Sequence, residues 1–216
     1  MRIGEMSMRR RILALALTAL LAFVVAAVPS SAEAGGGNNI VIVTNSTDGQ
    51  TLANASTQVI PVPMDTVTSS NIAIAQNTAC VGCHSSAVAV QILIVVGSPH
   101  YFAPGNAAVA ANGGCDSCGA YAYARQHWIQ ISGPAVLGGQ ARAQIDEIRQ
   151  EIASVTSSIL PSDVATDPSL TRDFELDSEL NALSNQLIQV VTSALQSDGV
   201  TTTTVFDGTQ ESAPTP

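Results

Sequence analysis

The sequence contains no lysine and almost no charge in its middle part. The stretch 38–133 holds only Asp48, Asp65, Asp116 and Arg125 as charged residues. Without lysine, the chain has no phosphate-binding loop of the nucleotide-hydrolase type. It also lacks the His-Glu-x-x-His motif of zinc peptidases, the Gly-x-Ser-x-Gly motif of serine hydrolases and a dinucleotide-binding glycine motif. We therefore expect a protein that is not an enzyme.

Positive charge is scarce as well. The formal net charge is −9, and residues 1–34 hold four arginines and two glutamates, so removing them leaves −11. Nucleic-acid binding depends largely on lysine and arginine contacts to phosphates. The sequence therefore predicts no nucleic-acid partner.

Residues 1–34 have the pattern of an export signal. Three arginines at 9–11 precede an apolar run, Ile12 to Val28, and Ala32-Glu33-Ala34 provides a small-residue cleavage site. The alternative is an uncleaved signal that anchors the chain, although the apolar run is short for a full membrane span. We expect a secreted or cell-surface protein that contacts a membrane only if its signal is retained.

The middle of the chain contains an internal duplication. Segments 71–99 and 106–134 agree at eleven positions at an offset of 35, including both Cys-x-x-Cys pairs. A weaker third copy begins at 39–45, and there Asp48-Gly49 replaces the cysteine turn. Internal repeats of this length indicate one structural unit per copy. The residues that define the clearer copies include Asn71, Gln91, Asn106 and Gln126.

Each copy is predicted to be a strand, a turn and a strand. Asp-Gly between alternating apolar runs is typical of hairpins, so we expect an α+β protein with two to three repeated β-hairpins in residues 35–134. Alternation places small alanines on one face, where backbones can approach closely, and Gln91 and Gln126 continue that face. A structural hydrogen bond between these two amides is favoured over ligand binding. On the opposite face, Tyr123 and Arg125 are expected to meet solvent.

Residues 135–199 are predicted to be helical. Apolar residues from Ala141 to Ile159 and from Leu176 to Val190 recur at steps of three and four, with a break near 161–171 that contains Pro161. Two such seams suggest an antiparallel helical hairpin. The threonine-rich tail, 200–216, is predicted to be disordered.

The four cysteines allow three interpretations. Structural disulfides among Cys80, Cys83, Cys115 and Cys118 are favoured because exported proteins meet an oxidising compartment. The pairing stays open, with a slight preference for a bond within each Cys-x-x-Cys pair. A zinc site made by all four thiolates is the second interpretation. Covalent c-type haem at Cys80-Val81-Gly82-Cys83-His84 is the third, but the second copy has no matching histidine.

Other polar residues receive structural interpretations. His100 and His127 are expected to be surface or packing residues rather than metal or haem ligands. The alternating acids Asp173, Glu175, Asp177 and Glu179 are expected to form a solvated helix face, because a calcium site would need a glycine-bearing loop.

The doubled motif Asn-x-Ala-x-Ala-x(4)-Cys-x-x-Cys-x(3)-Ala-x-Ala-x-Gln, at 71–91 and 106–126, resembles a family of exported actinobacterial sequences labelled peptide zinc metalloproteases. The similarity spans about residues 38–160 and corresponds to the family's extracytoplasmic accessory region. This chain has no peptidase motif, so the resemblance implies only an accessory module.

The function we expect is an exported, non-catalytic structural or binding module held by disulfides, with an unknown protein or cell-surface partner. The alternative is a zinc or c-type haem protein that assists a membrane zinc peptidase. Self-association through the weakly charged strands is a further alternative, because long Val/Ile runs have few charged residues beside them.

Overall fold

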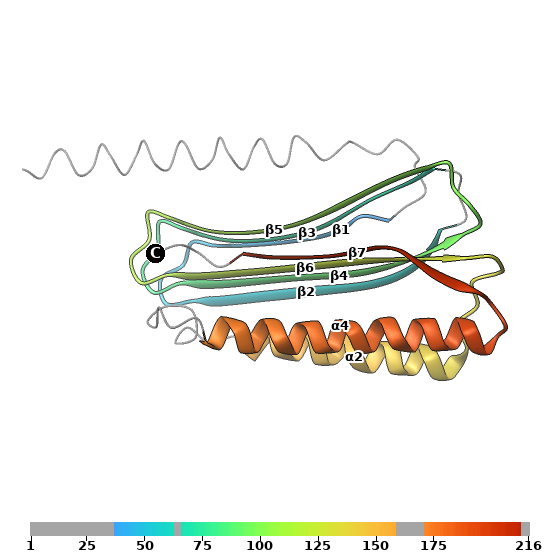
Figure 1. The fold of residues 1–216 in the computed structure, drawn as a ribbon. Helices are drawn as coiled ribbons and strands as arrows, with labels where there is room; N and C mark the ends of the chain where they lie inside the picture. The colour runs from blue at the N-terminus through green and yellow to red at the C-terminus, as the bar shows by residue number, and fades with distance from the viewer. Residues whose placement is uncertain (1–36, 63–65, 159–170, 213–216) are drawn as a thin grey trace, which may run out of the picture.

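The computed structural model describes residues 37–62, 66–158 and 171–212, so the predicted export signal lies outside the described residues. The described part has mixed α and β structure with seven strands in two sheets and two helices. Figure 1 shows three layers, with the helices below one sheet and the other sheet above it. The strands are β1 Asn39–Asn45, β2 Thr51–Val62, β3 Thr66–Thr78, β4 His84–Val96, β5 Tyr101–Gly113, β6 Gly119–Ile131 and β7 Thr202–Ser212, and the helices are α2 Gly139–Ser158 and α4 Thr171–Ser197.

The two strands of each repeat lie in different sheets. One sheet has the order β1-β3-β5 and the other β2-β4-β6-β7, and every pairing between repeats is parallel and in register. The predicted β-hairpins are therefore wrong, because the chain passes from one sheet to the other through each turn. Successive repeats stack as the coils of a short β-solenoid, in which Asn71 pairs with Asn106 and Gln91 with Gln126. A hairpin would place unlike residues side by side, whereas this stacking places each amide beside an identical one.

The space between the sheets is filled by small side chains at one end and large ones at the other. Alanines at 73, 75, 87, 89, 120, 122 and 124 are fully buried near the turns that carry the cysteines. At the opposite end, Trp128, Leu93 and Val67 form a second cluster. The sheets move apart toward that end in Figure 1. The predicted close approach of the alanine faces thus holds over the cysteine end.

Asparagine side chains join the repeats and the two sheets. Asn39 Nδ2 donates to Asn71 Oδ1 at 2.9 Å, and Asn71 Nδ2 donates to Asn106 Oδ1 at 2.8 Å. The same amides also cross the gap: Asn39 reaches carbonyls of Ser56 in β2 and Val90 in β4. Each strand of the first sheet therefore lies over the space between two strands of the second.

Two further amide ladders lie at other levels. Asn77 Nδ2 donates to Asn112 Oδ1 at 2.8 Å and to Gly119 O at 2.6 Å. Gln126 Nε2 donates to Gln91 Oε1 at 2.8 Å, and both glutamines are fully buried. Amide groups at three levels thus fix the register of the coils.

The C-terminal segment is a strand. The prediction of a disordered tail from residue 200 is wrong for 202–212, because β7 pairs antiparallel with β6. β5 of the other sheet lies over both β6 and β7, and Asn106 Nδ2 of β5 donates to Gly208 O of β7 at 2.8 Å. Phe206 packs against Trp128 with ring centroids 6.1 Å apart. These contacts give the threonine-rich segment a partly buried side that its composition does not reveal.

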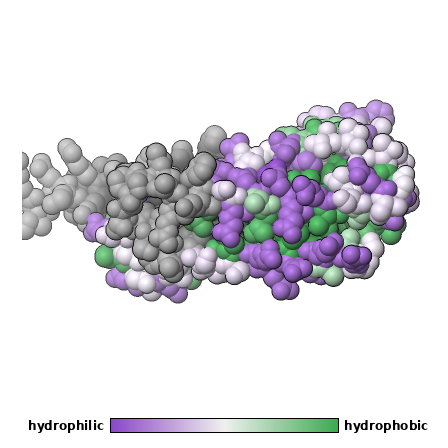
Figure 2. All heavy atoms as spheres, turned by 60° about the horizontal axis from the view of Figure 1, so that its bottom comes forward, coloured by the Kyte–Doolittle hydropathy of each residue, from purple (hydrophilic) through white to green (hydrophobic). Residues whose placement is uncertain are grey.

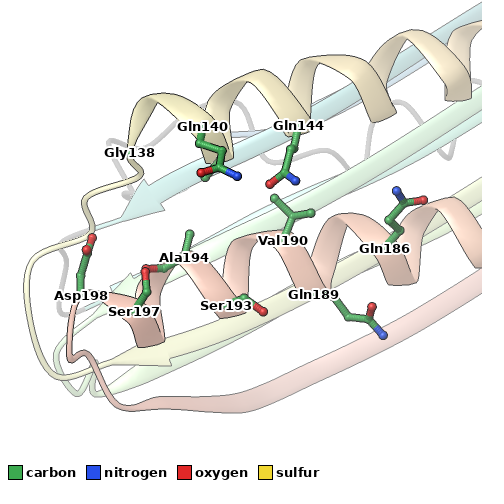
Figure 3. Close-up of a pocket in the computed structure, with 11 residues that line it drawn as sticks. Gly138, Gln140, Gln144, Gln186, Gln189, Val190, Ser193, Ala194, Ser197 and Asp198 are labelled. Atoms are coloured by element: carbon green, nitrogen blue, oxygen red, sulfur yellow. The ribbon is translucent and has the colours of Figure 1, made fainter.

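The helices cover the outer face of the four-stranded sheet. Their buried residues, among them Ile145, Ile152 and Leu187, form one cluster with outward residues of β4 and β6. The expected exposure of Tyr123 and Arg125 is wrong, since they are 0 and 8% exposed. The start of α2 lies beside the end of α4 (Figure 3), but the segment joining them lies outside the described residues, so the helical hairpin stays a prediction. No helix among the described residues has the length and apolarity needed to cross a membrane.

Replacing Asn71 by alanine should lower the free energy of unfolding by about 3 kcal/mol. The substitution leaves Asn106 Oδ1 without a donor and removes an acceptor from Asn39 in a buried network. Urea unfolding followed by circular dichroism measures the change. Asn54→Ala, at an exposed position of β2, is the control and should cost less than about 0.5 kcal/mol. Equal losses in both variants would contradict a structural role for the ladder.

Deleting residues 200–216 should cause self-association. Without β7, the edge of β6 and the inner side of β5 lose their cover, and exposed edges pair with other chains. Sedimentation velocity over a range of concentrations measures the effect, and deletion of 213–216 alone is the control. A shortened chain that stays monomeric with unchanged thermal stability would show that β7 is dispensable.

Candidate functional site

The cysteines lie in two stacked turns that join the sheets at one end of the solenoid. The turns span 79–83 and 114–118, at the end where β3 and β5 finish, on the left in Figure 1. Both use the left-handed backbone conformation at matching positions: Ala79 and Gly114 have φ of 53° and 64°, and Gly82 and Ser117 have φ of 61° and 56°. Two copies with different residues thus adopt one conformation, which superposes their Cys-x-x-Cys pairs.

All four sulfur atoms converge. Cys80 and Cys83 form a disulfide, while Cys115 and Cys118 are not bonded to each other. Cys83 Sγ lies 3.0 Å from Cys118 Sγ, and Cys80 Sγ lies 3.7 Å from Cys115 Sγ. All four Sγ atoms lie within 4.8 Å of one another. The bond between Cys80 and Cys83 is the pairing favoured from the sequence, whereas a bond between Cys115 and Cys118 stays a prediction.

The two cysteine pairs differ in their surroundings. Cys80 and Cys83 are 2 and 0% exposed, whereas Cys115 and Cys118 are partly exposed. Burial, together with a hydrogen bond to Cys115, raises the pKa of the Cys118 thiol to about 11. A thiol with a raised pKa is a poor nucleophile at neutral pH. The raised pKa therefore argues against rapid thiol chemistry at Cys118.

No described histidine joins this cluster. His84, the haem-type histidine, is 5% exposed, its Nδ1 has no partner among the described residues, and burial lowers its pKa. The disulfide uses both thiols that a covalent haem would need. His100 is exposed, and His127 lies beneath the helices with its pKa lowered by burial. The four cysteines are the compatible metal ligands among the described residues.

Thr204, His127 and Asp207 have the order of a catalytic triad but not its geometry. Thr204 Oγ1 and Asp207 Oδ1 each lie 3.5 Å from a different ring nitrogen of His127. A working nucleophile and base lie closer, at about 2.6–3.2 Å. Asp207 is also the ion-pair partner of Arg125, at 3.1 Å. This group ties β7 to β6, and Asn181 of α4 accepts from the same arginine at 3.2 Å.

A second polar cluster joins β6 to α4 and β7. Tyr121 Oη donates to Asp177 Oδ1 at 2.5 Å, and Glu211 lies on the same side. Burial raises the pKa of Asp177 to about 6 despite the tyrosine, and the nearby Glu211 adds to the shift. Asp177 is thus partly buried rather than fully solvated, while Asp173 and Glu175 lie where side chains are not described.

A groove of about 490 Å³ lies between the first turns of α2 and the last turns of α4. Figure 3 shows the amides of Gln140, Gln144 and Gln186 along its sides and Asp198 at its end. Its lining holds no nucleophile paired with a base. The groove is a gap between helix faces whose polar side chains are mostly uncharged, with Asp198 as the one acidic residue of its lining.

Sequence reasoning missed several residues that organise the site. Asn77 and Asn112 match in the repeat, and that match was the available signal for their ladder. Asp177 and Asp207 gave no signal, because their partners Tyr121 and Arg125 lie more than fifty residues away. The repeat-defining residues Asn71, Gln91, Asn106 and Gln126 all lie in amide ladders.

Comparison with protein-family models, with curated proteins and with solved structures found no match. The resemblance to the accessory region of the peptide zinc metalloprotease family therefore stays a prediction.

Asp177 should contribute about 1 kcal/mol more stability near pH 5 than near pH 7.5, whereas the buried His84 and His127, with their lowered pKa values, contribute in the opposite direction. The folded-state pKa of Asp177, about 6, is above the usual unfolded value, so protonation favours the folded state as pH falls, and the contribution is lost as pH rises through 6. The magnitude is reduced for partial exposure. Urea unfolding at the two pH values measures it. Asp177→Asn should remove most of this contribution and the exposed-site control Glu179→Gln should keep it; the reverse pattern would contradict the assignment.

Proposed function

We propose that this protein is an exported, non-catalytic structural or binding module, secreted or held at the cell surface, that acts on a protein or cell-surface partner. The observation that supports it best is the continuous scaffold: three coils are tied by amide ladders, closed by β7 and covered on one side by helices. The amide nitrogens of the ladders, such as those of Asn71, Asn77 and Gln126, donate to structural partners. Among the described residues, the four thiols are the only group of three or more possible metal ligands that converge.

The four cysteines support this role because they restrain the turns at one end of the solenoid. A bond between Cys80 and Cys83 restrains the turn after β3, and small exported domains gain about 2–4 kcal/mol from a disulfide. The strongly acidic composition supports a partner other than nucleic acid. A rigid frame with helices on one side suits presentation of a surface more than conversion of a substrate.

Intact-mass spectrometry of the exported protein, before and after reduction and alkylation, tests this proposal. A mass four hydrogens below the reduced form indicates two disulfides, and a mass two hydrogens below indicates one; both support a structural centre. The N-terminus found in the same measurement tests the expected export signal. A covalent haem adduct would overturn the proposal, and so would a tightly held metal with four alkylatable thiols.

The second candidate is a zinc protein, and the convergence of Cys80, Cys83, Cys115 and Cys118 favours it. Four thiolates at about 2.3 Å from a tetrahedral zinc ion lie about 3.8 Å apart. Two of the observed separations, 3.7 Å for Cys80–Cys115 and 3.9 Å for Cys83–Cys115, match this value. The bonded pair would have to be reduced first. In that state the four residues fit a structural zinc ion, which would hold the two turns together.

Zinc titration of the reduced protein under native mass spectrometry tests the second candidate. One bound zinc per chain, and a thiolate-to-metal absorption band when cobalt(II) replaces zinc, would support it. Cys118→Ser should weaken binding at least about tenfold, since ligand loss removes a metal–sulfur bond. Ser117→Ala in the same turn is the control and should bind as the wild type does. Equal binding by both variants would exclude the four-cysteine site.

A further inference from the structure

The free edge of β2 is the feature of this scaffold best suited to bind another chain. β2 is the first strand of the four-stranded sheet and pairs with β4 over twelve consecutive residues without a register shift. Among the described residues, no strand lies along its other edge. Natural proteins usually protect such edges with charges or bulges. The range 51–62 has neither a charged residue nor a bulge, and its one proline, Pro61, lies next to the end of the strand, so the free backbone groups of 51–60 remain available for pairing.

A groove of about 290 Å³ lies beside this strand, between β2 and α2. Its apolar part includes Val59 and Pro61 of β2, Ile94 of β4 and Ile145 of α2. A strand added to β2 would project every second side chain toward the helix layer. The groove therefore offers an apolar place for one such side chain. Figure 2 shows green apolar patches between the purple polar residues on the helix-bearing side of the molecule.

Positive charge is concentrated at the same place. Outside residues 1–34 the sequence has four arginines, of which Arg125 is buried and paired with Asp207. Two of the others, Arg142 and Arg149, line the groove. Arg149 pairs with Asp146 at 2.8 Å, whereas Arg142 is exposed and forms no ion pair within the described residues. The chain as a whole is strongly acidic. An unpaired arginine beside the free edge of β2 should therefore make that edge prefer a partner segment with a negatively charged side chain.

We infer that the β2 edge and the adjoining groove bind an extended segment of a partner protein that carries an acidic side chain among apolar ones. The backbone of the segment would pair with β2 and extend the sheet. An apolar side chain would enter the groove beside Val59, and a carboxylate two residues away would pair with Arg142. This deepens the proposed function, because it rests on the binding-module role and names the surface and the kind of partner.

A synthetic peptide of about ten residues provides the probe. It has threonine at every odd position and alternating valine and glutamate at even positions, so that one face carries both side chains that the groove selects. A matched peptide carries lysine in place of glutamate. Each is titrated into the isotope-labelled exported protein and followed by amide chemical shifts and hydrogen exchange. We expect the glutamate peptide to bind more tightly and to protect amides of β2.

Two variants test the charge preference, and each lowers the net charge by one. Arg142→Gln should weaken binding of the glutamate peptide about fivefold, which is the loss expected for one partly exposed ion pair. Gln144→Glu, on the side of α2 that faces α4, is the matched control and should leave both affinities unchanged. Equal effects of the two variants would show that only net charge matters and would overturn the assignment.

Other results distinguish this inference from the proposed function. Peptide binding that protects β5 or β7 instead of β2 would overturn the site. Protection of β2 by a second copy in the absence of peptide would assign the edge to self-association and would also overturn the inference. Neither result alters the mass measurement that tests the structural centre, so the binding-module proposal can hold while this site fails.

Discussion

The rest of this structure depends on the close approach of two sheets across a layer of alanine. Alanine side chains such as Ala73, Ala89 and Ala124 leave so little space that an asparagine on one sheet reaches the backbone of the other. A larger side chain at these positions would separate the sheets and leave buried amides without acceptors, which costs more than a lost contact. Small apolar residues and amides are therefore required together, and neither explains the fold alone.

This close approach also determines how the solenoid must end. Each asparagine of the ladder at Asn39, Asn71 and Asn106 lies above a pair of strands, so three strands on one side need four on the other. The repeats supply only three, and β7 supplies the fourth. The chain reaches this place after two helices that cover the outer face of the same sheet. β7 runs antiparallel to β6, whereas the strands of successive repeats pair in parallel. A further repeat therefore cannot stack on β7 in the same way, and this limits the number of coils in the solenoid.

The sequence predicted the components better than their connections. The repeat positions, the inward alanines, the inward glutamines and the two helices follow from periodicities that survive in any arrangement of strands. A hairpin and a turn between two sheets have the same local pattern of strand, turn and strand, so alternation and Asp48-Gly49 could not separate them. The identical residues at Asn71 and Asn106 carried the distinguishing information, because only parallel stacking places identical amides together. The role of 202–212 could not be read locally, since its partners, Asn106 and Trp128, lie far away in the chain.

The cysteine centre is a consequence of the same register. Repeats that stack in parallel bring Cys80 beside Cys115 and Cys83 beside Cys118, whatever chemistry the thiols then adopt. Pairing within a turn or pairing between turns can therefore form with little movement of the backbone, and so can coordination of one ion. The chemical environment decides which of these states forms. An oxidising compartment favours disulfides, while a reducing environment with available zinc favours four thiolates that bind the ion. The amide ladders hold the coils together in all three states, so the scaffold can persist while the chemistry at its end changes.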